Sequence, residues 1–218
     1  YKIYSPSSKE LDVRNAKLCH LALQKILKVE KRLDVVVNLV GVSHSGLGLT
    51  ATPEELSHLL DVNAVGNFRL LQLCAPHLSQ ATPGRFVCIG SLSGLVAFPN
   101  FSLYSASKFA LRGLCLSLHH ELLVQNIRLT CISPGAVKRD DSPPPPSSAR
   151  ARLPFLKWLL PLTTPRQVAD SIISVLQSSD PPAEAVVGRD ALFLSLLNRY
   201  LPQRVWRRIQ DFVWQRQQ

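Results

Sequence analysis

The stretch GSLSGLVAFPNFSLYSASK, residues 90–108, is the part of the sequence around which the rest of the chain is organised. It follows an apolar segment that ends at Ile89, and it leads into a long helical pattern. Tyr104 and Lys108 are four residues apart, so on a helix they share one face. An ammonium beside a phenol favours the tyrosinate and lowers the tyrosine pKa from about 10. Ser91 can offer a hydroxyl to the same oxygen, and the group predicts proton exchange with an alcohol or carbonyl oxygen.

A Tyr-x-x-x-Lys pair alone is a weak signal, because such pairs also arise by chance on solvated helices. Ser91 at the strand end, and the elements on both sides, strengthen the interpretation. With these motifs, the region from about Asp12 to Val137 resembles the short-chain dehydrogenase/reductase family. The active site of that family combines a Ser, a Tyr-x-x-x-Lys pair and an Asn from the preceding helix.

Strand-like and helix-like patterns alternate along the chain. They predict helices at 15–31, 53–79, 104–124 and 165–178 and strands at 33–41, 85–90, 127–132 and 185–187. The alternation predicts an α/β fold with a parallel sheet and right-handed crossovers. The family resemblance implies a Rossmann-like doubly wound parallel sheet.

The family begins with a strand, a glycine-rich turn and a helix that cradle the cofactor diphosphate, and nothing before residue 41 supplies them. The G-x-G-x-x-A match from Gly46 to Ala51 is interpreted as a flexible loop at the mouth of the site. Glu54 and Glu55 follow it at a helix start, where a pyrophosphate would sit. We therefore expect a sheet that lacks its first one or two strand–helix units. Either the parent protein is longer, which we favour, or the chain is a truncated variant.

The resemblance implies roles for single residues. Tyr104 is expected to be the general acid/base, and Lys108 to tune it while binding the nicotinamide ribose. Ser91 is expected to position the substrate oxygen, and Asn63 to hold a water that relays protons to Lys108. Local hydrogen bonds within its own helix would also account for Asn63. Cofactor contacts are expected from Tyr104 and Lys108 and from Asp12, Asn38, Gly41, Pro134, Gly135 and Val137.

Three positions depart from the family pattern near the cofactor. The family's Asn-Asn-Ala-Gly is Asn38-Leu39-Val40-Gly41 here, and Val40 is bulkier than the usual Ala beside the adenosine ribose. Arg139 stands where the family usually has a Thr that hydrogen-bonds the cofactor, and an Arg is able to meet a phosphate.

The composition excludes several classes of protein. The 218 residues, with 46% hydrophobic and 18% charged, fit one globular domain. The net charge of +10 comes from dispersed residues without a nucleic-acid motif, so no nucleic-acid partner is predicted. Five separated cysteines without ligand spacing predict buried thiols in a reducing compartment and no metal site.

Two segments bear on substrate and location. The family places its substrate lid at the proline-rich residues 134–165, and the apolar composition there favours a lipid, retinoid or steroid. A short helix packed on the core would explain the same residues. Residues 1–189 are predicted to be the Rossmann-like domain, and 190–218 a basic amphipathic helical extension in which Trp206 and Trp214 flank an apolar stripe. Such a helix lies on a membrane surface, or it docks on the domain or on a second subunit.

The sequence thus predicts an oxidoreductase of lipid metabolism that moves hydride between NADP or NAD and a hydrophobic alcohol or ketone. It is expected in the cytoplasm or on an intracellular membrane such as the endoplasmic reticulum, with a homodimer as a further expectation. The alternative is a catalytically inactive binding or scaffold protein that lost cofactor affinity with its N-terminal unit.

Overall fold

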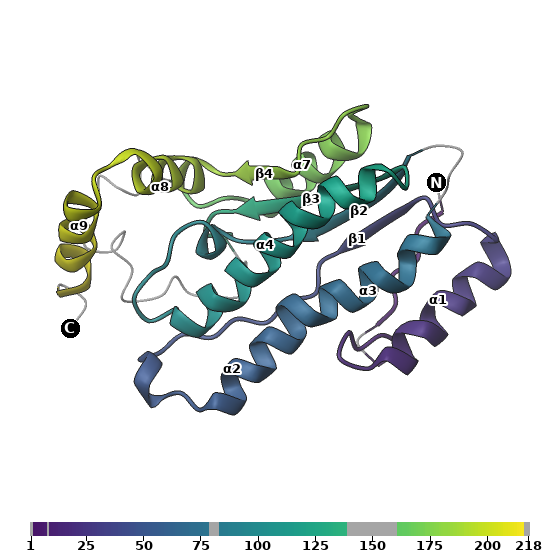
Figure 1. Cartoon of the computed structure of the whole chain (residues 1–218), viewed down its shortest axis with the longest axis horizontal. Coiled ribbons are helices and arrows are strands. Elements are labelled where there is room, and N and C mark those ends of the chain that lie inside the picture. The colour runs from purple at the N-terminus through teal and green to yellow at the C-terminus, as the bar shows by residue number, and fades with distance from the viewer. Residues whose placement is uncertain (1, 8, 79–82, 139–160, 216–218) are drawn as a thin grey trace.

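The computed structural model describes residues 2–7, 9–78, 83–138 and 161–215, with side chains as far as Phe212. In this part of the chain the centre of the fold is a parallel four-stranded sheet in the order β1-β2-β3-β4 (Figure 1). The strands are β1 (Val35–Asn38), β2 (Gly84–Ile89), β3 (Ile127–Pro134) and β4 (Glu184–Val187).

Local sequence sets the ends of the helices. α1 (Ala16–Glu30) begins after Asn15, whose side chain accepts two backbone N–H groups, and ends at Lys31 in the left-handed conformation. α2 (Pro53–Leu60) and α7 (Pro165–Gln177) each begin with a capping box and a proline in the first turn. Further α-helices are α3 (Gly66–Cys74), α4 (Ser102–Leu123), α8 (Arg189–Tyr200) and α9 (Gln203–Gln215).

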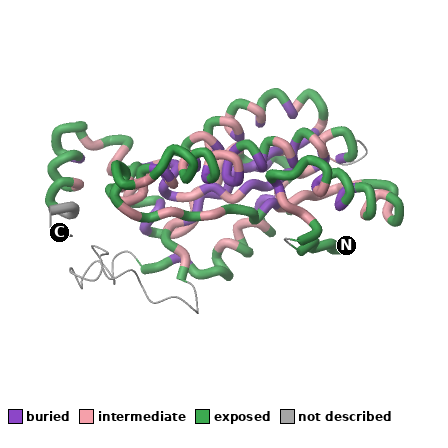
Figure 2. The backbone as a smooth tube through the Cα atoms, turned by 90° about the horizontal axis from the view of Figure 1, so that it is seen from below, coloured by how far each residue is buried: buried purple, intermediate pink, exposed green. Residues whose placement is uncertain are grey.

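Helices cover both faces of the sheet, because successive side chains of a strand point to opposite sides. Phe86 and Leu129 belong to the core that lies under α1, α3 and α4. Val87, next to Phe86, and Ile132, three residues after Leu129, point to the other face and belong to the core under α7. In Figure 2 the buried backbone accordingly runs through the middle of the molecule, between exposed outer turns. The predicted doubly wound α/β sheet is confirmed.

The register brings the carboxyl ends of the strands together. Asn38 pairs with Cys88, and Pro134 pairs with Val187. The segments that follow β1, β2 and β3 hold the predicted site residues, and they leave the sheet along this one edge, where ligands of such sheets bind. Within the described residues no strand pairs with the outer edge of β1, as expected for a sheet without its first strand–helix units.

Several predicted elements differ from the observed ones at their ends or in their interiors. The strand predicted at 33–41 pairs over only four residues. The helix predicted at 53–79 contains a π-helical turn at Asp61–Val65 and becomes 3₁₀-helical at Ala75–His77, and residues 79–82 lie outside the described part. The extension predicted at 190–218 forms two helices, since Pro202 lacks the N–H that would continue α8.

The C-terminal helices lie at the edge toward which β3 and β4 point (Figure 1). Trp206 of α9 is 5% exposed and packs with Leu92, Val96 and Ala191. The Gln210 side chain donates a hydrogen bond to the Ala97 carbonyl at 2.9 Å. Trp206 therefore anchors α9 to the segment that follows β2, which agrees with the alternative in which the C-terminal helix docks on the domain. The side chain of Trp214 is outside the described part.

Candidate active site

Ser91 stands where the chain leaves β2, and Gly90 determines its path. A methyl group at Gly90 would lie 2.8 Å from both Cys131 Sγ and Ser133 Oγ, so only glycine lets the chain pass over β3 here. The Ser91 hydroxyl accepts a hydrogen bond from the Ser93 N–H at 3.1 Å, which opens the short 3₁₀ turn Leu92–Gly94.

The segment after Ser91 packs directly against the helix that carries Tyr104 and Lys108. A methyl group at Gly94 would lie 2.8 Å from the Lys108 carbonyl oxygen. On α4 the Lys108 ammonium lies 5.8 Å from the centre of the Tyr104 ring, as the four-residue spacing predicts. The strand end and the Tyr-x-x-x-Lys helix thus form one unit.

Lys108 is a buried ammonium. It is 4% exposed, and its Nζ donates a hydrogen bond to the Ile89 carbonyl oxygen at 2.9 Å. Burial in place of hydration disfavours the charged form and lowers the pKa of Lys108. Among the described residues this is its one hydrogen bond, so two of the three ammonium N–H groups are left to donate to a ligand.

Asn63 links three elements of the site. Its Oδ1 accepts the Val42 N–H at 2.9 Å, and its Nδ2 donates to the Val42 carbonyl at 2.8 Å and to Ser107 Oγ at 2.9 Å. These partners lie on the loop after β1 and on α4, so the interpretation of Asn63 as satisfied within its own helix is wrong. The π-helical turn Asp61–Val65 contains this residue, and single π turns inside helices are frequent at functional sites.

Gly41 lies beside both the Asn63 and the Lys108 side chains. A methyl group at Gly41 would lie 3.3 Å from Asn63 Oδ1 and 3.4 Å from Lys108 Nζ. The backbone after β1 therefore passes close to both groups, and a ligand that lies on Gly41 comes within reach of the ammonium.

Asn38 is held by a side chain of α3. Its Nδ2 donates to Asn67 Oδ1 at 2.7 Å, and Asn67 Nδ2 donates to the Asn63 carbonyl at 3.0 Å. Asn38 Oδ1 accepts the Val40 N–H at 3.1 Å, which shapes the loop that leads to Gly41. The sequence reasoning missed Asn67 and Ser107. Helical spacing was the signal that could have found them. Asn67 lies four residues after Asn63 and Ser107 lies three residues after Tyr104, so each shares a helix face with a predicted site residue.

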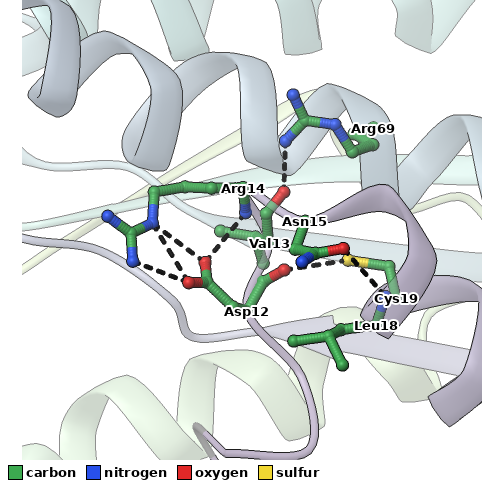
Figure 3. Close-up of polar contacts among 7 residues, drawn as sticks. All are labelled: Asp12, Val13, Arg14, Asn15, Leu18, Cys19 and Arg69. Atoms are coloured by element: carbon green, nitrogen blue, oxygen red, sulfur yellow. Dashed lines mark hydrogen bonds and ion pairs between the residues drawn. The ribbon is translucent and has the colours of Figure 1, made fainter.

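Asp12 and Val13 lie against α3 (Figure 3). Arg14 forms an ion pair with Asp12 at 2.6 Å, and hydrogen bonds from the Arg14 side chain and backbone N–H lower the pKa of Asp12 from 3.8 to about 2. Arg69 donates to the Val13 carbonyl, and a methyl group at Gly66 would lie 2.6 Å from Val13 Cγ2. The glycine of the Asn-x-x-Gly motif therefore makes room for Val13.

Pro134 is the last residue of β3, and Gly135 and Val137 follow it at the same edge of the sheet as Ser91. The Gly90 N–H donates to the Ile132 carbonyl at 2.7 Å, and the Gly135 N–H donates to the Val187 carbonyl at 2.8 Å. Val137 forms a parallel bridge with Thr163. Arg139 and most of the predicted lid at 134–165 lie outside the described part.

The described residues fit one half of a nicotinamide dinucleotide. Gly41, Asn63, Tyr104 and Lys108 meet at the sheet edge, and the two remaining donors of Lys108 suit ribose hydroxyls. The other half needs a glycine-rich turn for the diphosphate, and in the described ranges no such turn precedes Gly41. Among the same residues no group of three His, Cys, Asp or Glu side chains could hold a metal ion.

Comparison with known proteins gives consistent results. The family model of the short chain dehydrogenases matches residues 7–143. The chain is 39% identical over 133 residues to human 17-beta-hydroxysteroid dehydrogenase type 1, which covers 59% of this chain and 38% of that protein. It is 30% identical over 125 residues to 3-ketodihydrosphingosine reductase of Bacteroides thetaiotaomicron, which covers 57% of this chain and 46% of that protein.

Among solved structures, a short-chain dehydrogenase from Streptomyces avermitilis superposes with a TM-score of 0.73 at 26% identity, covering 92% of this chain and 79% of that one. The alignments with the two curated relatives span less than half the length of each relative.

Proposed function

The chain belongs to the short-chain dehydrogenase family, whose members use NAD or NADP, and we propose that it moves hydride between that cofactor and a hydrophobic alcohol or ketone. The observation that carries the proposal is the buried Lys108 ammonium, which lies over the Tyr104 ring and beside Gly41, where Asn63 also comes close, at the end of the sheet. Burial of an ammonium costs free energy unless hydrogen bonds or a ligand satisfy it, and an ammonium buried beside a phenol is suited to acid/base chemistry.

Each residue of the site has a stated part in this mechanism. In the reduction direction the Tyr104 hydroxyl gives its proton to the carbonyl oxygen, and in the oxidation direction Tyr104 takes the alcohol proton. Ser91 donates a hydrogen bond to the same oxygen and so holds the substrate in place. The positive charge of Lys108 stabilises the tyrosinate form, and its free N–H groups hold the nicotinamide ribose. The nicotinamide, when bound, supplies or accepts the hydride.

Further residues hold the cofactor and support the relay. Asn63 ties the loop after β1 to α4 through its bonds to Val42 and Ser107, and we assign it the water that passes protons to Lys108. Cofactor contacts are assigned to six residues outside the Tyr-x-x-x-Lys pair: Asp12, Asn38, Gly41, Pro134, Gly135 and Val137.

The substrate is proposed to be hydrophobic and lipid-like. A steroid dehydrogenase and a sphingosine-pathway reductase are among the relatives, and both names denote apolar substrates. A shallow and open surface groove of about 410 Å³ lies where the loop after β1 meets the start of α4, lined by Leu47, Gly48, Leu49, Pro99, Asn100 and Ser102. The leucine and proline side chains of this groove suit an apolar group.

The test of this function compares the protein with its Tyr104→Phe variant. The variant loses the proton carrier and keeps the ring, so turnover of a competent steroid or other apolar alcohol should fall by about 10² or more. Fluorescence titration with NADPH and NADH should give similar affinities for both proteins, because the variant loses one hydroxyl of the cofactor site and keeps the rest. Turnover that survives the change within a few-fold would contradict the role of Tyr104. Undetectable cofactor binding and turnover in both would favour the alternative, a catalytically inactive scaffold.

Contact with an anionic membrane surface is a second proposal, and α9 carries it. Val205 and Ile209 are exposed on this helix, and so are the cationic Arg204, Arg207 and Arg208. An exposed apolar strip with arginines at its sides suits the headgroup region of a bilayer. None of the described helices is long and apolar enough to cross a membrane.

Vesicle co-sedimentation tests the membrane proposal. The protein should sediment with phosphatidylserine vesicles at low salt and less at high salt, because salt screens the arginines. An Ile209→Ser variant should bind more weakly at both salt concentrations. Absence of binding at either salt concentration would contradict the proposal and leave the oxidoreductase proposal standing.

A further inference from the structure

A carboxylate is buried beneath the segment that follows β3. Asp190, in the first turn of α8, is 1% exposed. Its Oδ2 accepts the Ala136 N–H at 2.8 Å, and its Oδ1 accepts the Thr163 hydroxyl at 3.4 Å. Asp190 thus joins three chain segments that are far apart in the sequence.

Two glycines make room for this carboxylate. A methyl group at Gly135 would overlap all three outer atoms of the Asp190 side chain. A methyl group at Gly188 would overlap Thr163 Oγ1 and approach Asp190 Oδ1, and Gly188 has a φ of 103°, which favours glycine. The glycine of the Pro134-Gly135 pair is therefore required by the packing of Asp190, whether or not a cofactor is bound.

Backbone hydrogen bonds hold the same region in register. The Thr163 N–H donates to the Ala136 carbonyl at 3.0 Å, and the Lys138 N–H donates to the Thr163 carbonyl at 2.8 Å. These bonds leave the Ala136 N–H pointing away from Thr163, toward α8. Asp190 is the group that receives it.

Of the two hydrogen bonds to Asp190, the one from the Ala136 N–H at 2.8 Å is the short and strong one, and the one from the Thr163 hydroxyl at 3.4 Å is long. Burial of a carboxylate is costly unless hydrogen bonds satisfy its oxygens. Charge-assisted bonds from a backbone N–H are roughly twice as strong as neutral ones, and they fix the position of the donor. An apolar side chain in this place would fill the volume, but it would leave the Ala136 N–H buried without a partner.

We propose that Asp190 is a positioning residue that fixes the Gly135–Ala136 peptide, and with it the surface on which the nicotinamide ring rests. The part about the ring depends on the proposed function, because Pro134 and Gly135 are assigned cofactor contacts there and we place the nicotinamide ring on them. The part about the peptide depends only on the geometry of Asp190. Asp190 acts through Gly135 and Ala136 and is not itself a catalytic residue.

Backbone amide exchange of the chain without cofactor, followed by NMR, tests the first part. In Asp190→Ala the Ala136 amide should exchange roughly 10- to 100-fold faster, which matches the loss of a hydrogen bond to a charged group. Asp190→Asn should restore most of the protection, because its Oδ1 accepts the Ala136 N–H and the Thr163 hydroxyl turns to accept from the new NH₂. The amides of β2 are the internal control and should not change.

Gly135→Ala is a second variant for the case in which Asp190→Ala does not fold. It forces the carboxylate away without removing it, and it should expose the same Ala136 amide. Unchanged protection of Ala136 in Asp190→Ala and in Gly135→Ala would overturn the proposal. An equal loss of Ala136 amide protection in Asp190→Asn and Asp190→Ala would also overturn the proposal, since the side-chain oxygen would then not be the acceptor.

Steady-state kinetics test the part about the ring. Asp190→Ala should lower kcat by about 10- to 100-fold, the effect of a misplaced reacting group, with a smaller change in the KM of the alcohol. Asp190→Asn should recover most of kcat. If Asp190→Ala speeds the exchange of the Ala136 amide but leaves kcat unchanged, the positioning role is overturned and the proposed function stays intact. Absence of turnover in the unmodified protein would refute the proposed function and, with it, the part about the ring; amide exchange would still decide the peptide part.

Discussion

Replacement of Gly66 by alanine separates helix propensity from packing in this fold. Gly66 has ordinary helical dihedral angles, φ −64° and ψ −39°, so its backbone does not need glycine. Propensity alone therefore predicts that Gly66→Ala stabilises the protein by about 1 kcal/mol. The structure predicts the opposite sign, because the new methyl group would lie 2.6 Å from Val13 Cγ2 and 2.9 Å from the Asp61 carbonyl oxygen.

The size of the packing effect decides the outcome. Overpacking of a tight core costs about 1–3 kcal/mol, and here three atoms lie within 2.9 Å of the new methyl group, one of them a backbone oxygen that cannot turn away. The net effect of Gly66→Ala should be a loss of up to about 2 kcal/mol once propensity is subtracted. Gly113 on α4 is the matched control: it is exposed, and no atom lies within 4 Å of a methyl group there. Gly113→Ala should stabilise by about 0.5–1 kcal/mol.

Urea unfolding of the three proteins, followed by circular dichroism, measures the difference. The urea midpoints of the two variants should lie on opposite sides of that of the unmodified protein. In thermal unfolding, Tm should shift by roughly 2–4 °C for each kcal/mol. A Val13→Ala change should reduce the penalty of Gly66→Ala, because it removes the methyl group that is hit. Equal stabilisation by Gly66→Ala and Gly113→Ala would refute the packing of Val13 against Gly66, and with it the placement of the Asp12-Val13 segment on α3.

Two further predictions concern stability. The pKa of Asp12 is lowered to about 2 by Arg14, so this pair stabilises the fold above pH 3.8 and loses its contribution as the pH falls toward 2. When the free energy of unfolding is measured against pH in acid, Asp12→Asn should make it depend less on pH in this range. An unchanged pH dependence would contradict the pairing. Trp206→Ala should lower the free energy of unfolding by about 3–5 kcal/mol, since this buried side chain joins α9 to the core. Removal of the exposed Tyr200 side chain should change it by less than about 0.5 kcal/mol, and equal effects of the two changes would argue against the docking of α9.

The local patterns of the sequence identified the fold and most of its element ends. The capping residues Asn15, Thr52 and Thr164 act within one turn of the chain, so their effect is readable without the fold. The continuous apolar runs of β2 and β3 indicate strands that are covered on both faces. The pairing of Tyr104 with Lys108 follows from helical spacing alone.

Interruptions of regular structure were not predictable in this way. The π-helical turn at Asp61–Val65 forms where Asn63 bonds to Val42 and Ser107, and these partners are 21 and 44 residues away along the chain. Local propensity for a regular helix is the same with or without such partners. The sequence accordingly predicted one uniform helix here.

The sequence by itself determined that the chain alternates strands and helices, that a Tyr-x-x-x-Lys helix follows a strand-end serine, and that the family is that of the short-chain dehydrogenases. The alternation and the Tyr-x-x-x-Lys spacing depend on single elements, which hydrophobic periodicity and capping encode directly, whereas the family is indicated by the resemblance of the motifs to those of that family. Only the tertiary structure decided that Trp206 is buried on the segment after β2, and that Asp190 receives the Ala136 N–H. The physical reason is that a buried polar or aromatic group takes its partner from whichever element packs on it, and a sequence does not record that choice.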